Sequence, residues 1–184
     1  MQRGDVRARM VKGAVRLLAV NGVEGTSFAE VLAATDAPRG SVYHHFPGGK
    51  NELLHAALDL ASERGLAAVE ATRGQPAAAV VERFLDLWGG LLDRSQLSAG
   101  CAVLAVTVGA NDAQLLDHAG TIFRTWTDRL TDLFVAGGMK KGAATQLAAT
   151  VVAATEGAVV LSRAERSREP FDHVAATLRR LAKS

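Results

Sequence analysis

The sequence has a single cysteine, Cys101, among its 184 residues. One cysteine cannot form a disulfide within the chain, which suits a reducing compartment. The N-terminus carries charged residues where a secretory signal would have an apolar core. The longest nearly apolar run, Leu147 to Leu161, is interrupted by Glu156 and is shorter than the roughly 20 residues that span a bilayer. We therefore expect a cytoplasmic protein with no membrane partner.

The motifs of several enzyme classes are missing as well. The chain has no Gly-x-Ser-x-Gly elbow, no phosphate-binding loop, no His-Glu-x-x-His pair and no cysteine-rich metal set. The neighbouring side chains of His44 and His45 cannot share one helical face as metal ligands. We expect no enzyme activity, no metal and no cofactor. A DNA-binding regulator and an all-helical ligand-binding or adaptor protein are the classes left open.

The hydrophobic pattern is helical throughout. No alternating strand pattern is present, whereas Ala, Leu, Val and Arg recur at helical spacing, and 48% hydrophobic residues are enough for a core. We predict an all-α fold in which three short helices come first and longer ones follow. The expected helices cover about 5–20, 28–35, 38–45, 50–72, 77–94, 112–136 and 142–166, with a last helix after Pro170 and an irregular or short helical stretch at 100–110.

Local signals set the ends of the first helices. Asn21 and Gly22 favour a left-handed residue that stops the first helix. Ser27 and Glu30 have the spacing of a capping box that opens the second. The break before Pro38 is short, and proline is acceptable there because it begins the next helix. Two helices joined by a tight turn predict a helix-turn-helix.

The charge distribution points to the same part of the chain. Residues 1–55 hold seven Lys or Arg and five Asp or Glu, whereas the rest of the chain holds fourteen of each. The whole excess of the formal net charge of +2 therefore lies in the N-terminal third, as expected if that third meets a polyanion. Taken alone, so small an excess also fits an ordinary solvated surface.

The predicted third helix carries groups that suit a DNA groove. Arg39 can offer a bidentate fork to guanine or phosphate, and Ser41 can donate or accept at a base edge. Gly40 lets the backbone approach DNA closely, at a cost of about 1 kcal/mol in helix propensity. Further groups are expected to bind phosphate oxygens, although each could instead be an ordinary surface or core residue. These are Thr26, Ser27, Tyr43, His44, His45 and Lys50.

The run from Gly22 to Leu58 resembles the DNA-binding head of the tetracycline-repressor (TetR) family, through its Thr-Ser-Phe start and its Gly-x-x-Tyr-x-His-Phe core with a downstream Lys-x-x-Leu. Pro-Arg-Gly-Ser-Val-Tyr-His-His-Phe-Pro-Gly-Gly-Lys resembles the LmrA/YxaF-type branch. The resemblance implies a DNA-binding domain at 1–55, a helical effector-binding and dimerisation domain at 56–184, and repression of an operator. The chain departs from many relatives with Asp36 in the turn, Pro38 as the cap and one extra residue before Lys50.

The C-terminal part supplies candidates for a ligand site and a dimer interface. Aromatic rings make apolar walls for a flat effector, and a polar group among them can orient it; the alternative is that they form an ordinary core. The candidate ligand residues are Phe84, Trp88, His118, Phe123, Trp126 and Glu156. The helix around 147–161 is apolar on nearly its whole circumference, so we expect it and the last helix to form a homodimer interface. The candidate interface residues are Leu147, Val151, Ala154, Ala158, Leu161, Phe171, Val174 and Leu178.

Overall fold

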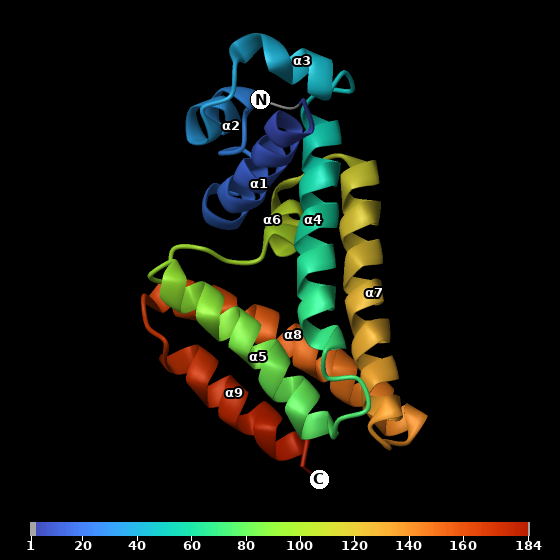
Figure 1. Cartoon of the computed structure of the whole chain (residues 1–184). Coiled ribbons are helices and arrows are strands. Elements are labelled where there is room, and N and C mark those ends of the chain that lie inside the picture. The colour runs from blue at the N-terminus through green and yellow to red at the C-terminus, as the bar shows by residue number, and fades with distance from the viewer. Residues whose placement is uncertain (1–2, 184) are drawn as a thin grey trace. The chain divides into compact units, whose positions relative to one another are not determined.

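The computed structural model describes residues 3–183, and helices are the only regular secondary structure in that range (Figure 1). This confirms the predicted all-α fold. The elements are α1 (Arg3–Asn21), α2 (Phe28–Thr35), the 3-10 turn η1 (Arg39–Ser41), α3 (Val42–His45), α4 (Lys50–Glu70), α5 (Ala77–Arg94), α6 (Ala102–Gly109), α7 (Ala113–Ala136), α8 (Lys141–Glu165) and α9 (Glu169–Leu181).

The helix ends with strong local signals lie where the sequence predicted them. The Ser27 hydroxyl oxygen accepts a hydrogen bond from the N–H of Glu30 at 3.1 Å, so α2 begins at its expected cap. Asp36 ends α2 with φ 49° in the left-handed region, which aspartate tolerates better than most residues. Gly22, at φ +71°, closes α1 in the same way.

The predicted helix over 38–45 is divided in two. Pro38 stays extended at ψ 134°, and the Ser41 N–H donates to its carbonyl oxygen at 2.9 Å, which makes a 3-10 turn. Only Val42–His45 is α-helical. A proline at the start and a glycine in the middle weaken the first turn, so the tighter geometry replaces a full α-helix there.

The chain packs into two compact units. Unit 1 comprises residues up to Ser62 together with Cys101–Ile122, and unit 2 comprises Glu63–Gly100 and Phe123–Ser184. The α6 helix and the first part of α7 therefore pack with the N-terminal helices. The sequence had assigned both to the second domain, residues 56–184. Both α4 and α7 run from one unit into the other.

Unit 1 surrounds a core formed by one side of α1 and the first half of α4. Met10 and Leu18 of α1 and Leu54 and Leu58 of α4 are fully buried. The α2 and α6 helices both pack on α1. Burying four such side chains is worth roughly 1.5–3 kcal/mol each, so this core fixes the short helices that precede α4.

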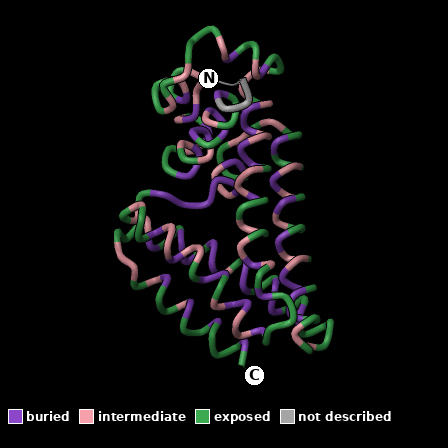
Figure 2. Tube along the Cα trace, viewed as in Figure 1, coloured by how far each residue is buried: buried purple, intermediate pink, exposed green. Residues whose placement is uncertain are grey.

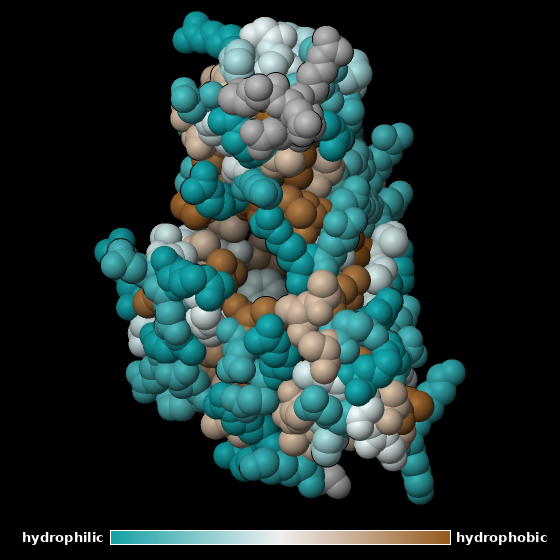
Figure 3. Space-filling model, viewed as in Figure 1, coloured by the Kyte–Doolittle hydropathy of each residue, from teal (hydrophilic) through white to brown (hydrophobic). Residues whose placement is uncertain are grey.

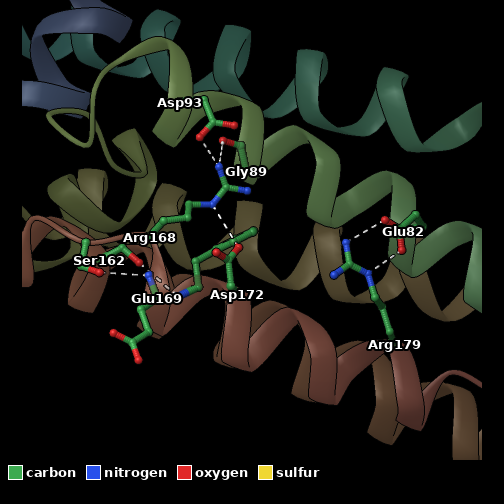
Figure 4. A network of polar contacts seen from close by, with 10 residues as sticks. Glu82, Gly89, Asp93, Ser162, Arg168, Glu169, Asp172 and Arg179 are labelled. Atoms are coloured by element: carbon green, nitrogen blue, oxygen red, sulfur yellow. Dashed lines mark hydrogen bonds and ion pairs between the residues drawn. The ribbon is translucent and has the colours of Figure 1, made fainter.

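In unit 2, α5, α8 and α9 pack on one another, and a polar network ties α9 to α5 (Figure 4). Arg168 pairs with Asp93, donates to the Gly89 carbonyl oxygen at 3.2 Å and lies 5.0 Å from the ring centre of Phe171. A Cβ at Gly89 would lie 2.7 Å from the Arg168 guanidinium, so a larger residue there would require the end of the arginine side chain to shift. Hydrophilic side chains cover most of the face over α5 and α9 (Figure 3).

The α8 helix is long and apolar enough to cross a membrane by length and composition, but half of that window is buried inside the chain. This pattern is typical of a core helix in a water-exposed protein. Five of the expected interface residues lie in the same core, each no more than 8% exposed: Leu147, Val151, Ala158, Phe171 and Leu178. Their side chains offer no surface to a second subunit, which corrects the interface residues taken from the sequence. Ala154 and Val174 are half-buried, and Leu161 is 51% exposed.

Candidate nucleic-acid interface

The segment that follows the helix-turn-helix turn, residues 39–45, is here called the recognition segment. Two buried side chains anchor it, since Val42 is 2% exposed and Phe46, directly after it, is fully buried. The Phe46 N–H donates to the Val42 carbonyl oxygen at 2.8 Å and closes the short helix. Figure 2 shows the trace around these anchors as mostly exposed. The anchors therefore turn the polar residues of the segment outward.

Arg39, Gly40 and His44 are exposed, and His45 is half-buried. A Cβ built on Gly40 has no atom within 4 Å, so nothing within the described residues requires glycine at this position. The Ser41 hydroxyl donates to the Pro38 carbonyl oxygen at 2.5 Å. The Ser41 hydroxyl oxygen is then left to accept a hydrogen bond from another group. The segment thus offers the guanidinium donors of Arg39, a glycine without a side chain at position 40, and the acceptor oxygen of Ser41.

Tyr43 is the most exposed aromatic residue of the recognition segment, at 75%. Its ring lies edge-on to Phe28, with 6.0 Å between ring centres. Phe28 begins α2 beside the capping residue Ser27, so the contact joins the start of α2 to the recognition segment. The hydroxyl of Tyr43 is thereby held on a defined side of the surface, and a phenol so placed can donate to a phosphate oxygen.

The structure gives Thr26 and Lys50 internal roles. Thr26 is fully buried, and its hydroxyl donates to the Gly22 carbonyl oxygen at 2.7 Å, so it is removed from the phosphate-binding set. The Lys50 ammonium donates to the Val23 carbonyl oxygen at 2.7 Å, which ties the start of α4 to the loop after α1. Two of its three N–H groups stay available for other acceptors. Ser27 is half-buried at the start of α2.

Two arginines of α1 link this helix to the end of α2. Arg9 donates to the Thr35 carbonyl oxygen at 3.1 Å, and Arg16 donates to that of Ala34 at 3.5 Å. Both carbonyls belong to the last turn of α2, where the helix dipole is negative. The i, i+7 spacing of the two arginines was the available signal, because it places them on one side of α1.

Five of the six candidate ligand residues lie in unit 2 and one lies in unit 1. Four of them, Phe84, Trp88, Phe123 and Trp126, meet in unit 2 as a chain of edge-to-face rings with centres 5.5–6.3 Å apart, here called the aromatic cluster. Glu156 is 7% exposed in α8 of the same unit. His118 belongs to unit 1, where it contacts His55 and Asp59.

A short exposed helix that follows a second helix after a tight turn, with hydrogen-bond donors and a glycine on its outer side, defines a helix-turn-helix DNA-binding protein. The profile for the tetR family of bacterial regulatory proteins matches residues 10–57, and that for the C-terminal domain of LmrA/YxaF-like transcriptional regulators matches 76–177. The chain belongs to the TetR family, in its LmrA/YxaF-like branch. It is a DNA-binding transcriptional regulator and not an enzyme, as the sequence predicted.

Relatives and solved structures agree over nearly the whole chain. An uncharacterised HTH-type transcriptional regulator of Mycobacterium tuberculosis, Rv0196, is 34% identical over 95% of this chain and 93% of its own. The HTH-type transcriptional regulator LmrA of Bacillus subtilis is 25% identical over the full length of both chains. The crystal structure of the regulatory protein TetR from Rhodobacter sphaeroides has a TM-score of 0.82 at 19% identity, covering 94% of this chain and 96% of that one.

Proposed function

We propose that the chain is a cytoplasmic repressor that binds double-stranded operator DNA as a homodimer and leaves it when a small effector binds. The observation that carries the DNA-binding part is the outward presentation of the recognition segment, which Val42 and Phe46 anchor in the core. Arg39 and Ser41 read base edges, and Gly40 allows close approach. Tyr43, His44, His45, Ser27 and Lys50 bind phosphates.

The homodimer is proposed to form on the exposed side of α8. Small or apolar residues recur along that side, and Val160 and Leu161 are 45% and 51% exposed. Gly157 lies between them and the start of the helix, with no atom within 4 Å of an added Cβ. The half-buried Ala154 and Val174 flank this surface on α8 and α9. The proposed interface consists of Ala149, Ala153, Ala154, Gly157, Val160, Leu161, Ala164 and Val174. A two-fold axis there would present two recognition segments to one duplex.

The effector is proposed to be a flat, largely apolar compound that binds at the aromatic cluster. Trp88 and Phe123 are half-buried, so part of each ring is available to a ligand. The buried carboxylate of Glu156 gives the same unit a group that would pair with a hydroxyl or a cation on that compound. Because α4 and α7 continue from unit 1 into unit 2, both are proposed to carry the effect of ligand binding to the recognition segment.

The experiment uses two glycine-to-alanine variants. Neither Gly40 nor Gly65 has an atom within 4 Å of an added Cβ, so both variants are expected to fold. On a duplex selected from a random pool by the wild-type chain, Gly40→Ala should lose about tenfold or more in affinity, because the methyl group meets DNA. Gly65→Ala should bind like the wild type. Equal affinities for the two variants, or no retention of any duplex at raised salt, would contradict the proposal.

A further inference from the structure

Three polar side chains join α4 to α7 inside unit 1, and we call them the histidine latch: His55, Asp59 and His118. The Nδ1 atoms of His55 and His118 lie 2.6 Å apart. On the other side of the His118 ring, Nε2 lies 2.9 Å from Oδ1 of Asp59. His55 and Asp59 are one turn apart on α4, so His118 of α7 bridges them. The three groups therefore form one continuous chain of contacts.

The two imidazole rings meet edge to edge. Their centres are 4.8 Å apart and their planes differ by 26°. The ring centres are 4.8 Å apart and the Nδ1 atoms 2.6 Å apart, so the difference corresponds to about one ring radius on each side. The two nitrogens therefore point at each other along the line that joins the rings, which is the alignment of an N–H···N hydrogen bond. The His118 side chain is 22% exposed, so water has only partial access to this bond.

Counting hydrogens defines when the latch can exist. Asp59 is an acceptor when ionised, so Nε2 of His118 carries a hydrogen and donates to it. With both rings neutral, Nδ1 of His118 is then bare and accepts from the Nδ1–H of His55. One extra proton is tolerated on the outer nitrogen of His55, because the N–H···N bond persists. A second extra proton places hydrogens on both Nδ1 atoms, which cannot stay 2.6 Å apart.

We propose that the histidine latch is an acid-operated switch that holds α4 against α7 at neutral pH and opens when both imidazoles become cations. Histidine is the side chain whose charge ordinarily changes between about pH 5 and 8. Two positive rings repel at this distance, so the His55–His118 contact breaks, whereas the His118–Asp59 contact becomes an ion pair and remains. The α4 and α7 helices then separate at His55.

The charged surroundings of the latch are simple among the described residues. From α4, Asp59 is the charged group in contact with the pair. From the start of α7, Asp112 lies further along the same seam, where it accepts from the Asn51 amide at 2.9 Å. The Asn51–Asp112 bond is a second polar contact between the first turn of α4 and the residue before α7. The acid response is expected at His55, about a turn and a half after Lys50.

The effect on operator binding rests on the proposed function, because α4 begins directly behind the recognition segment. A displacement of α4 moves Lys50 and, with it, the loop held at Val23. We expect the open latch to weaken binding of the selected duplex about fivefold or more, which is the lower range of allosteric coupling. Acid would thus act as a second release signal beside the effector.

The latch itself is tested on the full chain without DNA. His55→Gln supplies an uncharged amide that can donate to a bare Nδ1 of His118 or, through its oxygen, accept from a protonated one. Between about pH 8 and pH 5, the wild-type melting temperature should fall about 3 °C further than that of this variant. His173→Gln, which changes an exposed histidine of α9, should follow the wild type. Equal pH profiles for wild type and His55→Gln would overturn the latch. If His55→Gln does not fold, nitrogen NMR of the wild-type imidazoles decides, since the latch requires hydrogens on His118 Nε2 and His55 Nδ1 at neutral pH.

A second arm measures duplex affinity over the same pH range in a background that carries His44→Gln and His45→Gln, which removes the histidines of the recognition segment. The latch predicts a loss of about fivefold or more on acidification that His55→Gln abolishes. If duplex binding is absent at neutral pH in the wild type, the proposed function fails, while the melting arm still decides the latch. If binding is present but its pH response is the same in both proteins, the regulatory role of the latch is contradicted.

Discussion

The Nη1 atom of Arg9 lies 3.1 Å from the carbonyl oxygen of Thr35 and donates a hydrogen bond to it. Thr35 is the last residue of α2, directly before the left-handed Asp36. The contact therefore joins the long first helix to the turn that sets the direction of the recognition segment. A guanidinium at the negative end of a short helix satisfies a carbonyl that has no partner within that helix.

The Arg9 contact predicts a stability effect. Arg9→Met keeps the apolar stem but removes the donor, and we expect the free energy of unfolding to fall by roughly 1.5–3 kcal/mol, as for a hydrogen bond to a charged group. Lys12→Met on the exposed side of the same helix should change it by less than about 0.5 kcal/mol. Urea unfolding measures both. A loss for Arg9→Met no larger than that for Lys12→Met would show that α2 does not depend on this contact.

Glu70 predicts an acid-dependent part of the stability. Hydrogen bonds from Arg73 and Arg129 lower the pKa of the Glu70 carboxyl from 4.5 to about 2. Since the folded pKa lies below the unfolded one, the stabilisation is fully present above pH 4.5 and is lost as the pH falls toward 2. Glu70→Gln should therefore be less stable than the wild type at neutral pH and equal to it near the lower pH. Unfolding curves for both proteins across this range measure the difference, with Glu165→Gln as the exposed control. A difference that does not shrink on acidification would contradict the prediction.

Lys50 makes a prediction about salt. If its ammonium contacts a phosphate, Lys50→Ala should weaken binding to all duplexes similarly and reduce the slope of log affinity against log salt by about one. Titrations of a selected and an unrelated duplex at several salt concentrations measure this. An unchanged slope would restrict Lys50 to holding the Val23 carbonyl oxygen.

Gly157 tests the proposed dimer interface. Its added side chain has free space within the subunit, so Gly157→Leu should keep the helical content while obstructing a partner. We expect the variant to sediment as a monomer at micromolar concentration where the wild type is a dimer. Asp86→Leu, at an exposed position of α5, is the control for a surface leucine and should stay dimeric. A dimeric Gly157→Leu variant would place the interface elsewhere.

Much of the fold could be predicted because its signals are local. Ser27, Asp36 and Gly22 determine helix ends through the conformations of their own backbone and neighbouring bonds. Such signals do not depend on the rest of the chain. They located α2 at the bounds found in the structure.

Burial and pairing could not be predicted in the same way. The apolar circumference of α8 showed that it is covered, but Val151 and Ala158 alone do not reveal whether the cover is this subunit or another one. The His55–His118 contact joins residues 63 positions apart, and no local pattern connects them. Thr26 matched a phosphate-binding position by its place before α2, whereas its burial depends on the packing of unit 1.

Hydroxyl-radical footprinting on a duplex selected by the wild-type chain tests operator binding by a homodimer most directly. A homodimer should protect two half-sites related by a two-fold axis, with centres about one helical turn or a multiple of it apart. Arg39→Ala should relax the base preference at one position of each half-site and leave the spacing unchanged. A single unrepeated half-site, protected by a monomer and insensitive to Arg39→Ala, would contradict operator binding by a homodimer.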